Sequence, residues 1–165
     1  MNKPLAARFR CTPMSRQWLA DCMSAGWTKG APLALKHQTF PHKLRDYEAL
    51  KQRLLAVAGQ AVCLHAEEDL LTILSRGQFY RGYNSRTMRG RPINCHANSA
   101  SLWAANKGQL TLVTGYALSR DGMWRCHSWC VGMGGKVIET TEKRVLYYGF
   151  PMTKTEAEEF QRNNW

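Results

Sequence analysis

Two Cys-His pairs stand out as groups that could do chemistry. Cys95 and His96 lie in the segment INCHANSASLW, and Cys126 and His127 lie in WRCHSWCV. A cysteine thiolate is a strong nucleophile, and cysteine and histidine are also the usual ligands of zinc. The pairs therefore fit either covalent catalysis by one cysteine or coordination of a metal ion.

Cys95 is the better candidate for a nucleophile. The segment NCHANSASLWAAN predicts a helix that is capped by Asn94 and stopped at Gly108. Cys95 then lies in the first turn, where the positive end of the helix dipole lowers the pKa of a thiol.

A base and an orienting acid follow along the chain. His127 lies in the middle of a predicted strand, on the same face as Trp129. A tight turn, GMGG, leads to a strand that carries Glu139, and this hairpin brings Glu139 beside His127, where a carboxylate would orient the imidazole. His96 is not expected to take part. Neighbouring residues of a helix point about 100° apart, so His96 should face away from the Cys95 sulfur.

A zinc site is the alternative interpretation. The available ligands are Cys95, His96, Cys126, His127 and Cys130. The sequence contains no C-x-x-C, and strand alternation separates Cys126 and Cys130 from His127. These two cysteines would also lie roughly 13 Å apart along the strand, too far to share one ion. We therefore expect no metal and no other cofactor.

The elements that must position these residues follow an α+β order. Helices are predicted at residues 14–26, 44–59 and 66–77, and a short strand after them. Beyond the cysteine helix, strands are predicted at 110–118, 123–131, 136–141 and 145–149. TKTEAEEFQR closes the chain as a helix, with Thr153 and Glu156 spaced as a capping box. We predict one domain, 1–165, with a mostly helical extension (1–77) and a core (78–165) in which the cysteine helix packs on an antiparallel sheet.

The order of these pieces resembles the papain-like superfamily of cysteine hydrolases, and in particular its transglutaminase-like branch. The matching pieces are NCHANSASLW, CHSWCV and VIETT, within residues 93–141. The resemblance implies a papain-like core in which Cys95 is the nucleophile, His127 the general base and Glu139 the orienting acid. It also implies cleavage, deamidation or acyl transfer at an amide or ester bond of a protein or peptide-like substrate. Two features depart from the family pattern: the spacing from Cys95 to His127 is compact, and Glu139 stands where Asp or Asn is usual.

Further residues are candidates for contact with the substrate: Gln78, Arg81, Asn98 and Trp129. Gln78, Asn84 or the Cys95 amide could donate a hydrogen bond to an oxyanion. Arg81 ends the short predicted strand near the loop before Cys95, and Trp129 could form a wall of the site. Asn98 lies one helical turn after Cys95, where local hydrogen bonding is its more ordinary role.

The charge of the chain suggests a second kind of function. Lys and Arg outnumber Asp and Glu by 23 to 12, which gives a net charge of +11. The densest cluster interleaves aromatic residues with Arg76, Arg81, Arg86, Arg89 and Arg91. Arginine beside aromatic residues suits phosphate and base contacts. A non-catalytic basic module that binds nucleic acid or an acidic protein is therefore the alternative function, and a solvated basic loop would have the same sequence features.

Composition indicates a folded chain in the cytoplasm. Hydrophobic residues make up 44% and charged residues 21%, which are globular values. No apolar run approaches the length of a membrane span, and no apolar stretch follows the first basic residues, so neither a membrane partner nor a secretory signal is expected. The cysteines should then be free thiols, with Cys11, Cys22 and Cys63 buried as structural residues.

Overall fold

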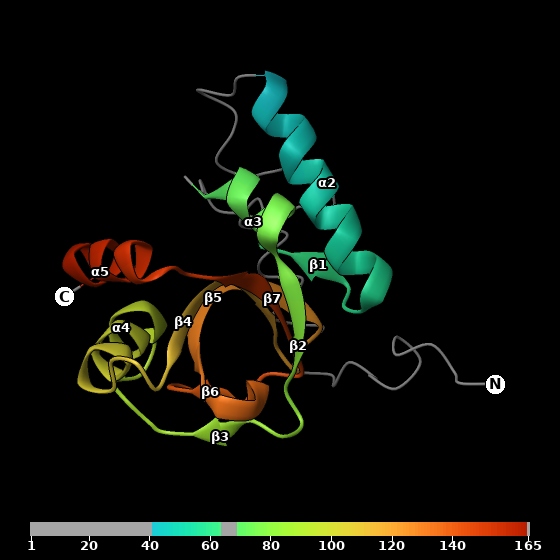
Figure 1. The fold of residues 1–165 in the computed structure, drawn as a ribbon. Coiled ribbons are helices and arrows are strands. Elements are labelled where there is room, and N and C mark those ends of the chain that lie inside the picture. Colours follow the sequence, from blue (N-terminus) through green and yellow to red (C-terminus); the bar gives the residue numbers. More distant parts are fainter. Residues whose placement is uncertain (1–40, 64–68, 165) are drawn as a thin grey trace. The chain divides into compact units, whose positions relative to one another are not determined.

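The computed structural model of the chain describes residues 41–63 and 69–164. Contacts divide the chain into two compact units, one of Met1–Ser75 with Leu118–Cys126 and the other of Arg76–Ala117 with His127–Trp165. The helix predicted at 14–26, together with Cys11 and Cys22, lies outside the described residues. The described part is α+β, as predicted, with a curled sheet that is mostly antiparallel (Figure 1).

The first unit contains helix α2, Pro41–Val57. Its residues Tyr47, Leu50 and Leu54 are buried along one face, which confirms the helical spacing behind the helix predicted at 44–59. Helix α3, Leu70–Arg76, agrees with the described part of the helix predicted at 66–77.

A two-residue strand, β1, follows α2. It comprises Ala61–Val62 and pairs in parallel with the start of β5, Met123–Val131. Gly59 makes the turn into β1 at a φ of 94°, and a Cβ there would lie 2.8 Å from Trp124 Nε1. Trp124 Nε1 donates to Ala58 O at 2.8 Å. A strand of two residues has no alternation, which is why the sequence did not predict β1.

The sheet runs in the order β2-β7-β4-β5-β6-β3, with β1 beside β5. The remaining strands are Gln78–Arg81 (β2), Arg86–Thr87 (β3), Thr111–Leu118 (β4), Val137–Glu139 (β6) and Leu146–Pro151 (β7). β2 with β7 and β5 with β6 are antiparallel pairs, whereas β3 joins β6 in parallel. The four strands predicted after the cysteine helix are all present, close to their expected bounds.

Strand β3 lies where the sequence predicted only a basic loop. Its pairing is extended by two further bonds, from Met88 N to Glu139 O and from Gly90 N to Thr140 O, both at 2.8 Å. Charged residues and glycine give no alternating pattern here, so the strand could not be recognised from sequence. The consequence is that the segment before the cysteine helix is fixed along the strand that carries Glu139.

Two helices accompany the sheet in the second unit. Helix α4, Cys95–Ala105, ends before the predicted stop at Gly108, because Asn106 caps it and donates from Nδ2 to Leu102 O at 2.9 Å. Helix α5, Lys154–Asn163, begins with the predicted capping box: Glu156 N donates to Thr153 Oγ1, and Thr153 N donates to Glu156 Oε2. The two helices contact each other.

A compact aromatic and aliphatic cluster forms the core of the second unit. Its members are Val113, Ala117, Trp129, Val137 and Tyr147, all almost completely buried. Trp129 and Tyr147 pack with ring centroids 4.9 Å apart. Within residues 41–63 and 69–164, no helix combines the length and the apolar character needed to cross a bilayer.

Candidate active site

The first turn of α4 carries the candidate nucleophile. Cys95 is its first residue and Asn94 its N-cap, as predicted, although the Asn94 side chain makes no capping hydrogen bond. The first bond of the helix runs from Asn98 N to Asn94 O at 3.0 Å. The amide groups of residues 95–97 therefore have no acceptor within the helix, and they give this end its partial positive charge.

Asn98 holds the loop before Cys95 against α4. Its Oδ1 accepts from Arg91 N at 3.0 Å, and its Nδ2 donates to Arg91 O at 2.7 Å. Between this clamp and the cysteine, Ile93 is fully exposed and has a φ of 60°, a costly conformation for a β-branched residue. Both ends of the Asn98 carboxamide thus fix the loop, and its contact with a substrate stays a prediction.

The imidazoles of both histidines lower the pKa of the Cys95 thiol. His96 Nδ1 lies 2.7 Å from Ser128 Oγ on β5. His127, the residue before Ser128, is 2% exposed. That His96 faces away from the Cys95 sulfur stays a prediction.

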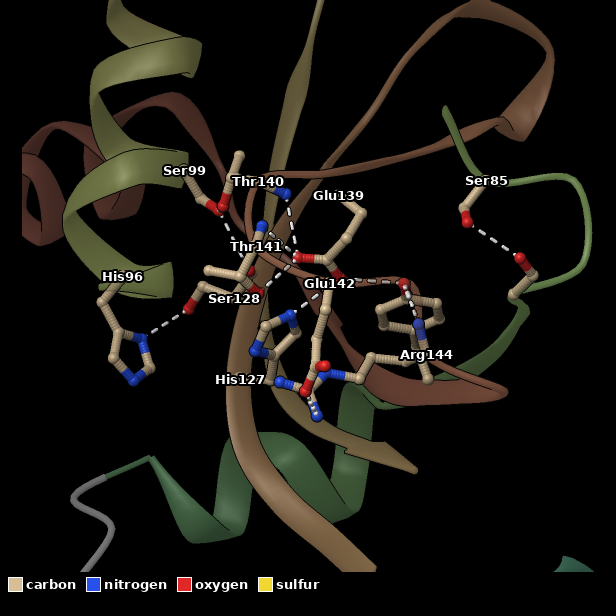
Figure 2. A network of polar contacts seen from close by, with 12 residues as sticks. Ser85, His96, Ser99, His127, Ser128, Glu139, Thr140, Thr141, Glu142 and Arg144 are labelled. Carbon is tan, nitrogen blue, oxygen red and sulfur yellow. Dashed lines mark hydrogen bonds and ion pairs between the residues drawn. The ribbon is translucent and has the colours of Figure 1, made fainter. Parts of the chain in front are cut away.

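His127 lies beside the buried carboxylate of Glu139 (Figure 2). His127 Nε2 is 2.9 Å from Glu139 Oε2, and Glu139 is completely buried. A carboxylate can only accept, so Nε2 carries the hydrogen in this contact. The other ring nitrogen, Nδ1, is then the one available to accept a proton from Cys95. The predicted proximity of Glu139 and His127 is confirmed.

Both carboxylate oxygens of Glu139 accept more than one hydrogen bond. Oε1 accepts from Thr140 N and Thr141 N, each at 2.8 Å, and from Thr141 Oγ1 at 2.9 Å. Oε2 accepts from His127 and from the Tyr147 hydroxyl at 2.9 Å. A buried carboxylate with this many donors remains ionised and cannot rotate freely.

The electrostatics favour a thiolate beside an imidazolium. Burial alone would raise the pKa of Cys95, but hydrogen bonds from His127 and His96, and their charges, lower this pKa to about 5. Burial would lower the pKa of His127, but its bonds to Cys95 and Glu139 and their charges raise it to about 9. Burial would likewise raise the pKa of Glu139, yet its bond to His127, the charge of that ring and the other donors lower it to about 2. All three groups are thus charged at neutral pH.

The strand register explains how Glu139 reaches His127. In the β5–β6 pair, Cys130 lies opposite Ile138, and continuing the register by one residue puts Trp129 opposite Glu139. Glu139 therefore meets His127 diagonally, across one step of the pleat, and not directly. Sequence reasoning missed Tyr147 completely, because nothing in a buried strand aromatic distinguishes a hydrogen-bond donor from a core residue.

Gln78, Arg81 and Trp129 are the other three residues that the sequence predicted to contact the substrate. Gln78 is exposed and donates from Nε2 to Tyr80 OH at 2.6 Å, and Arg81 is exposed at the end of β2. In the described part of the chain neither forms a hydrogen bond with Cys95. Trp129 is completely buried and stacks on His127 with the centroids 6.3 Å apart, so it supports the imidazole from inside the core.

The other described cysteines have different surroundings. Cys63, Cys95, Cys126 and Cys130 are all free thiols. Cys63 and Cys130 are buried, the first as predicted, and burial raises the pKa of Cys130 to about 12. No group of three or more Cys, His, Asp or Glu that could bind a metal occurs within residues 41–63 and 69–164.

The basic cluster has two kinds of arginine. Arg76 belongs to the fold, because it forms an ion pair with Glu156 at 2.6 Å and lies over the Phe150 ring. The others are exposed and have no acidic partner among the described residues: Arg81, Arg86, Arg89 and Arg91. The strand pairing of β3 and the Asn98 clamp hold the last three of these in the segment that leads to Cys95.

No protein-family model matches the chain, and neither a curated protein nor a solved structure is similar to it. The assignment of a function therefore rests on the geometry and electrostatics of the site itself.

Proposed function

We propose that the protein is a cysteine-dependent hydrolase or acyltransferase that acts on an amide or ester bond through Cys95, His127 and Glu139. The observation that carries the proposal is the position of His127, whose Nε2 lies 2.9 Å from the buried Glu139 carboxylate and whose imidazole lowers the pKa of the Cys95 thiol. This arrangement supplies a nucleophile, a base and a group that orients the base.

Before substrate binds, the Cys95 proton would already lie on His127, so that the reaction begins from a thiolate and an imidazolium. The thiolate attacks the substrate carbonyl carbon, and the carbonyl π electrons move to the oxygen. When they return, the bond from carbon to the leaving nitrogen or oxygen breaks, and His127 gives its proton to the leaving group. Water or another acceptor then attacks the thioester, loses a proton to His127, and releases Cys95 as the thiolate.

The start of α4 would stabilise the oxyanion. The Cys95 amide has no acceptor within the helix, and it is attached to the residue whose sulfur binds the carbonyl carbon. Gln78 and Asn84 are the two side chains predicted from sequence as donors, and Gln78 bonds Tyr80. The Cys95 amide is the donor that we assign, because it belongs to the nucleophile itself.

The resemblance to the papain-like superfamily, and to its transglutaminase-like branch, is part of this proposal. It is supported by the order of the three pieces: a cysteine that opens a helix, a histidine on β5, and an acid on the adjoining antiparallel strand β6. A protein or peptide-like substrate follows from that resemblance.

The test needs no knowledge of the natural substrate. Iodoacetamide at mildly acidic pH should label Cys95 far faster than the other cysteines, as measured by peptide mass spectrometry. With p-nitrophenyl acetate, the wild-type protein should release p-nitrophenolate and form an acetyl thioester on Cys95. Cys95→Ser and His127→Ala should lose both, whereas Cys126→Ser should keep both. Labelling of Cys95 no faster than that of Cys126 would refute the proposal.

A non-catalytic binding function has one observation in its favour. Residues 70–120 contain no Asp or Glu, and four exposed arginines of this stretch have no acidic partner among the described residues: Arg81, Arg86, Arg89 and Arg91. Nucleic acid or an acidic protein would complement this charge. A protein with this function alone would bind a polyanion normally after Cys95→Ser and would show no selective labelling of Cys95.

A further inference from the structure

Ser99 is a buried polar residue on the face of α4 that carries Cys95. It follows Cys95 by four residues, so the two side chains leave the helix on the same side, one turn apart. Ser99 is 0% exposed, and with Ala100 and Trp103 it forms the buried part of the helix. A buried hydroxyl is unfavourable unless it is hydrogen-bonded, so the partners of Ser99 show what the residue does.

The chain next to His127 and Glu139 provides these partners (Figure 2). Ser99 Oγ donates to Ser128 O on β5 at 2.9 Å and lies 3.3 Å from Thr140 Oγ1. Because the one hydrogen of Ser99 goes to the carbonyl oxygen, the Thr140 hydroxyl is the donor in the second contact. Ser128 directly follows His127, and Thr140 directly follows Glu139. A single hydroxyl therefore joins α4 to β5 and to the end of β6.

The backbone of Ser99 has a bond to the same strand. Its carbonyl oxygen accepts from Cys130 Sγ at 3.4 Å. Ser128 and Cys130 are two residues apart on β5, so they lie on one face of the sheet, and this face meets α4. Apolar packing alone would let the helix slide on the sheet, because the hydrophobic effect has no direction. The two directional bonds from Ser99 to β5 oppose such sliding one turn after Cys95.

We propose that Ser99 is a positioning residue of the site: its hydroxyl fixes the first turns of α4 on β5 and β6, and so sets the position of Cys95 relative to His127. The proposal deepens the proposed function and rests on it. The contact of His127 with Glu139 does not need Ser99, because it joins β5 to β6 directly. Loss of the Ser99 hydroxyl should therefore displace the nucleophile and leave its base in place.

The experiment measures the pH dependence of iodoacetamide alkylation of Cys95 in wild type, Ser99→Ala, His127→Gln and the double variant. Ser99→Ala should move the alkylation midpoint to higher pH, and a shift of one unit slows alkylation at pH below the midpoint about tenfold. In the His127→Gln background, Ser99→Ala should add little, because both changes act on the same pair of groups. The partners of Ser99 stay neutral during the titration, since they are hydroxyls, a carbonyl and the Cys130 thiol, whose pKa burial raises to about 12.

Two further variants separate positioning from stability. Asn106→Ala weakens the other end of the same helix, where Nδ2 bonds a backbone oxygen, and it should lower the melting temperature without moving the midpoint. Thr140→Val removes the hydroxyl that donates to Ser99 and keeps the size of the side chain. It should shift the midpoint less than Ser99→Ala does, because the bond from Ser99 to Ser128 O remains.

The outcomes distinguish this inference from the proposed function. If Ser99 only stabilises the fold, Ser99→Ala will lower the melting temperature and leave the midpoint unchanged, and the inference fails while the triad stands. An equal shift with and without His127, or an equal shift in Asn106→Ala, would also overturn it. Should Ser99→Ala not fold, an unchanged midpoint in Thr140→Val overturns it. If wild-type Cys95 is alkylated no faster than Cys126, the proposed function fails, and the inference with it.

Discussion

The hydroxyl of Tyr147 lies 2.9 Å from Glu139 Oε2, the same oxygen that His127 Nε2 meets at 2.9 Å. Tyr147 is completely buried, and its contact with the Glu139 anion raises the pKa of its hydroxyl further above the already raised value that burial produces. The phenol therefore stays a donor at all moderate pH values. Tyr147 and His127 thus both hydrogen-bond Oε2 of Glu139. The Tyr147 hydroxyl holds this oxygen in place, and the oxygen in turn fixes the direction in which the His127 imidazole points.

Tyr147→Phe should weaken both the fold and the site. The change leaves a buried carboxylate with one donor fewer, which should lower the free energy of unfolding by about 1–3 kcal/mol. A less restrained Glu139 should also reduce turnover of p-nitrophenyl acetate, by about tenfold. Tyr80→Phe is the matched control, because that hydroxyl bonds Gln78. If the two variants behave alike in urea unfolding and turnover, Tyr147 has no role in the site.

Cys95 and His127 should titrate far from their ordinary values. We expect the thiolate to appear at about pH 5 and the imidazolium to persist to about pH 9. Glu139→Gln removes the charge that favours the imidazolium, so the His127 pKa should fall and the Cys95 pKa should rise. Thiolate absorbance and imidazole NMR shifts measure the two directly. Glu142→Gln, at an exposed carboxylate that pairs with Arg144, should change neither. Equal shifts in both variants would contradict the triad.

The shifted pKa values of Cys95, His127 and Glu139 predict how the free energy of unfolding depends on pH. Unfolded, Cys95 titrates near 9.0 and His127 near 6.5. Between the folded Cys95 pKa of about 5 and 6.5, the unfolded pair binds one more proton than the folded pair, so stability increases with pH. From there to about 9 both states hold equal numbers of protons and the contribution is constant. Glu139 adds stability above 4.5 that is lost as the pH falls through its folded value of about 2. Urea unfolding of wild type and Cys95→Ser measures what the Cys95–His127 pair contributes to the free energy of unfolding. A difference between the two proteins that does not change from about pH 5 to pH 6.5 would disprove the prediction.

Asn98→Ala should lower turnover although Asn98 bonds Arg91 and not the nucleophile Cys95. The variant loses both bonds to Arg91, so the loop that leads into Cys95 is no longer fixed, and we expect turnover and the melting temperature to fall together. Asn106→Ala provides the control at the other end of the same helix, where Nδ2 bonds only backbone. It should lower the melting temperature alone. Unchanged turnover in Asn98→Ala would show that the loop position is immaterial.

The exposed arginines should determine binding to polyanions. Replacing Arg86, Arg89 and Arg91 together with Ala should weaken binding of labelled single-stranded DNA and flatten its dependence on salt, because fewer counterions are released. A control that removes the same charge replaces exposed lysines away from this segment: Lys136, Lys143 and Lys154. Equal losses in the two triple variants would mean that only net charge matters.

The parts of the site that the sequence predicted are those set by local rules. A helix start places Cys95, and strand alternation with a tight turn brings His127 and Glu139 together. The diagonal register, by contrast, depends on the geometry of residues 132–135. Tyr147 was missed for another reason: its role depends on where a second element places an oxygen, and no spacing along one element encodes that.

The donors around Glu139 have a consequence for the charge inside the site. At neutral pH the thiolate, the imidazolium and the carboxylate sum to one negative charge, enclosed in a chain whose formal net charge is +11. An anionic ligand would be drawn to the arginines but repelled at the sulfur. A neutral carbonyl meets no such repulsion, and its reaction only moves the negative charge from sulfur to an oxygen beside the first amides of α4. In the proposed reaction the site would therefore favour uncharged electrophiles, whatever the surface attracts.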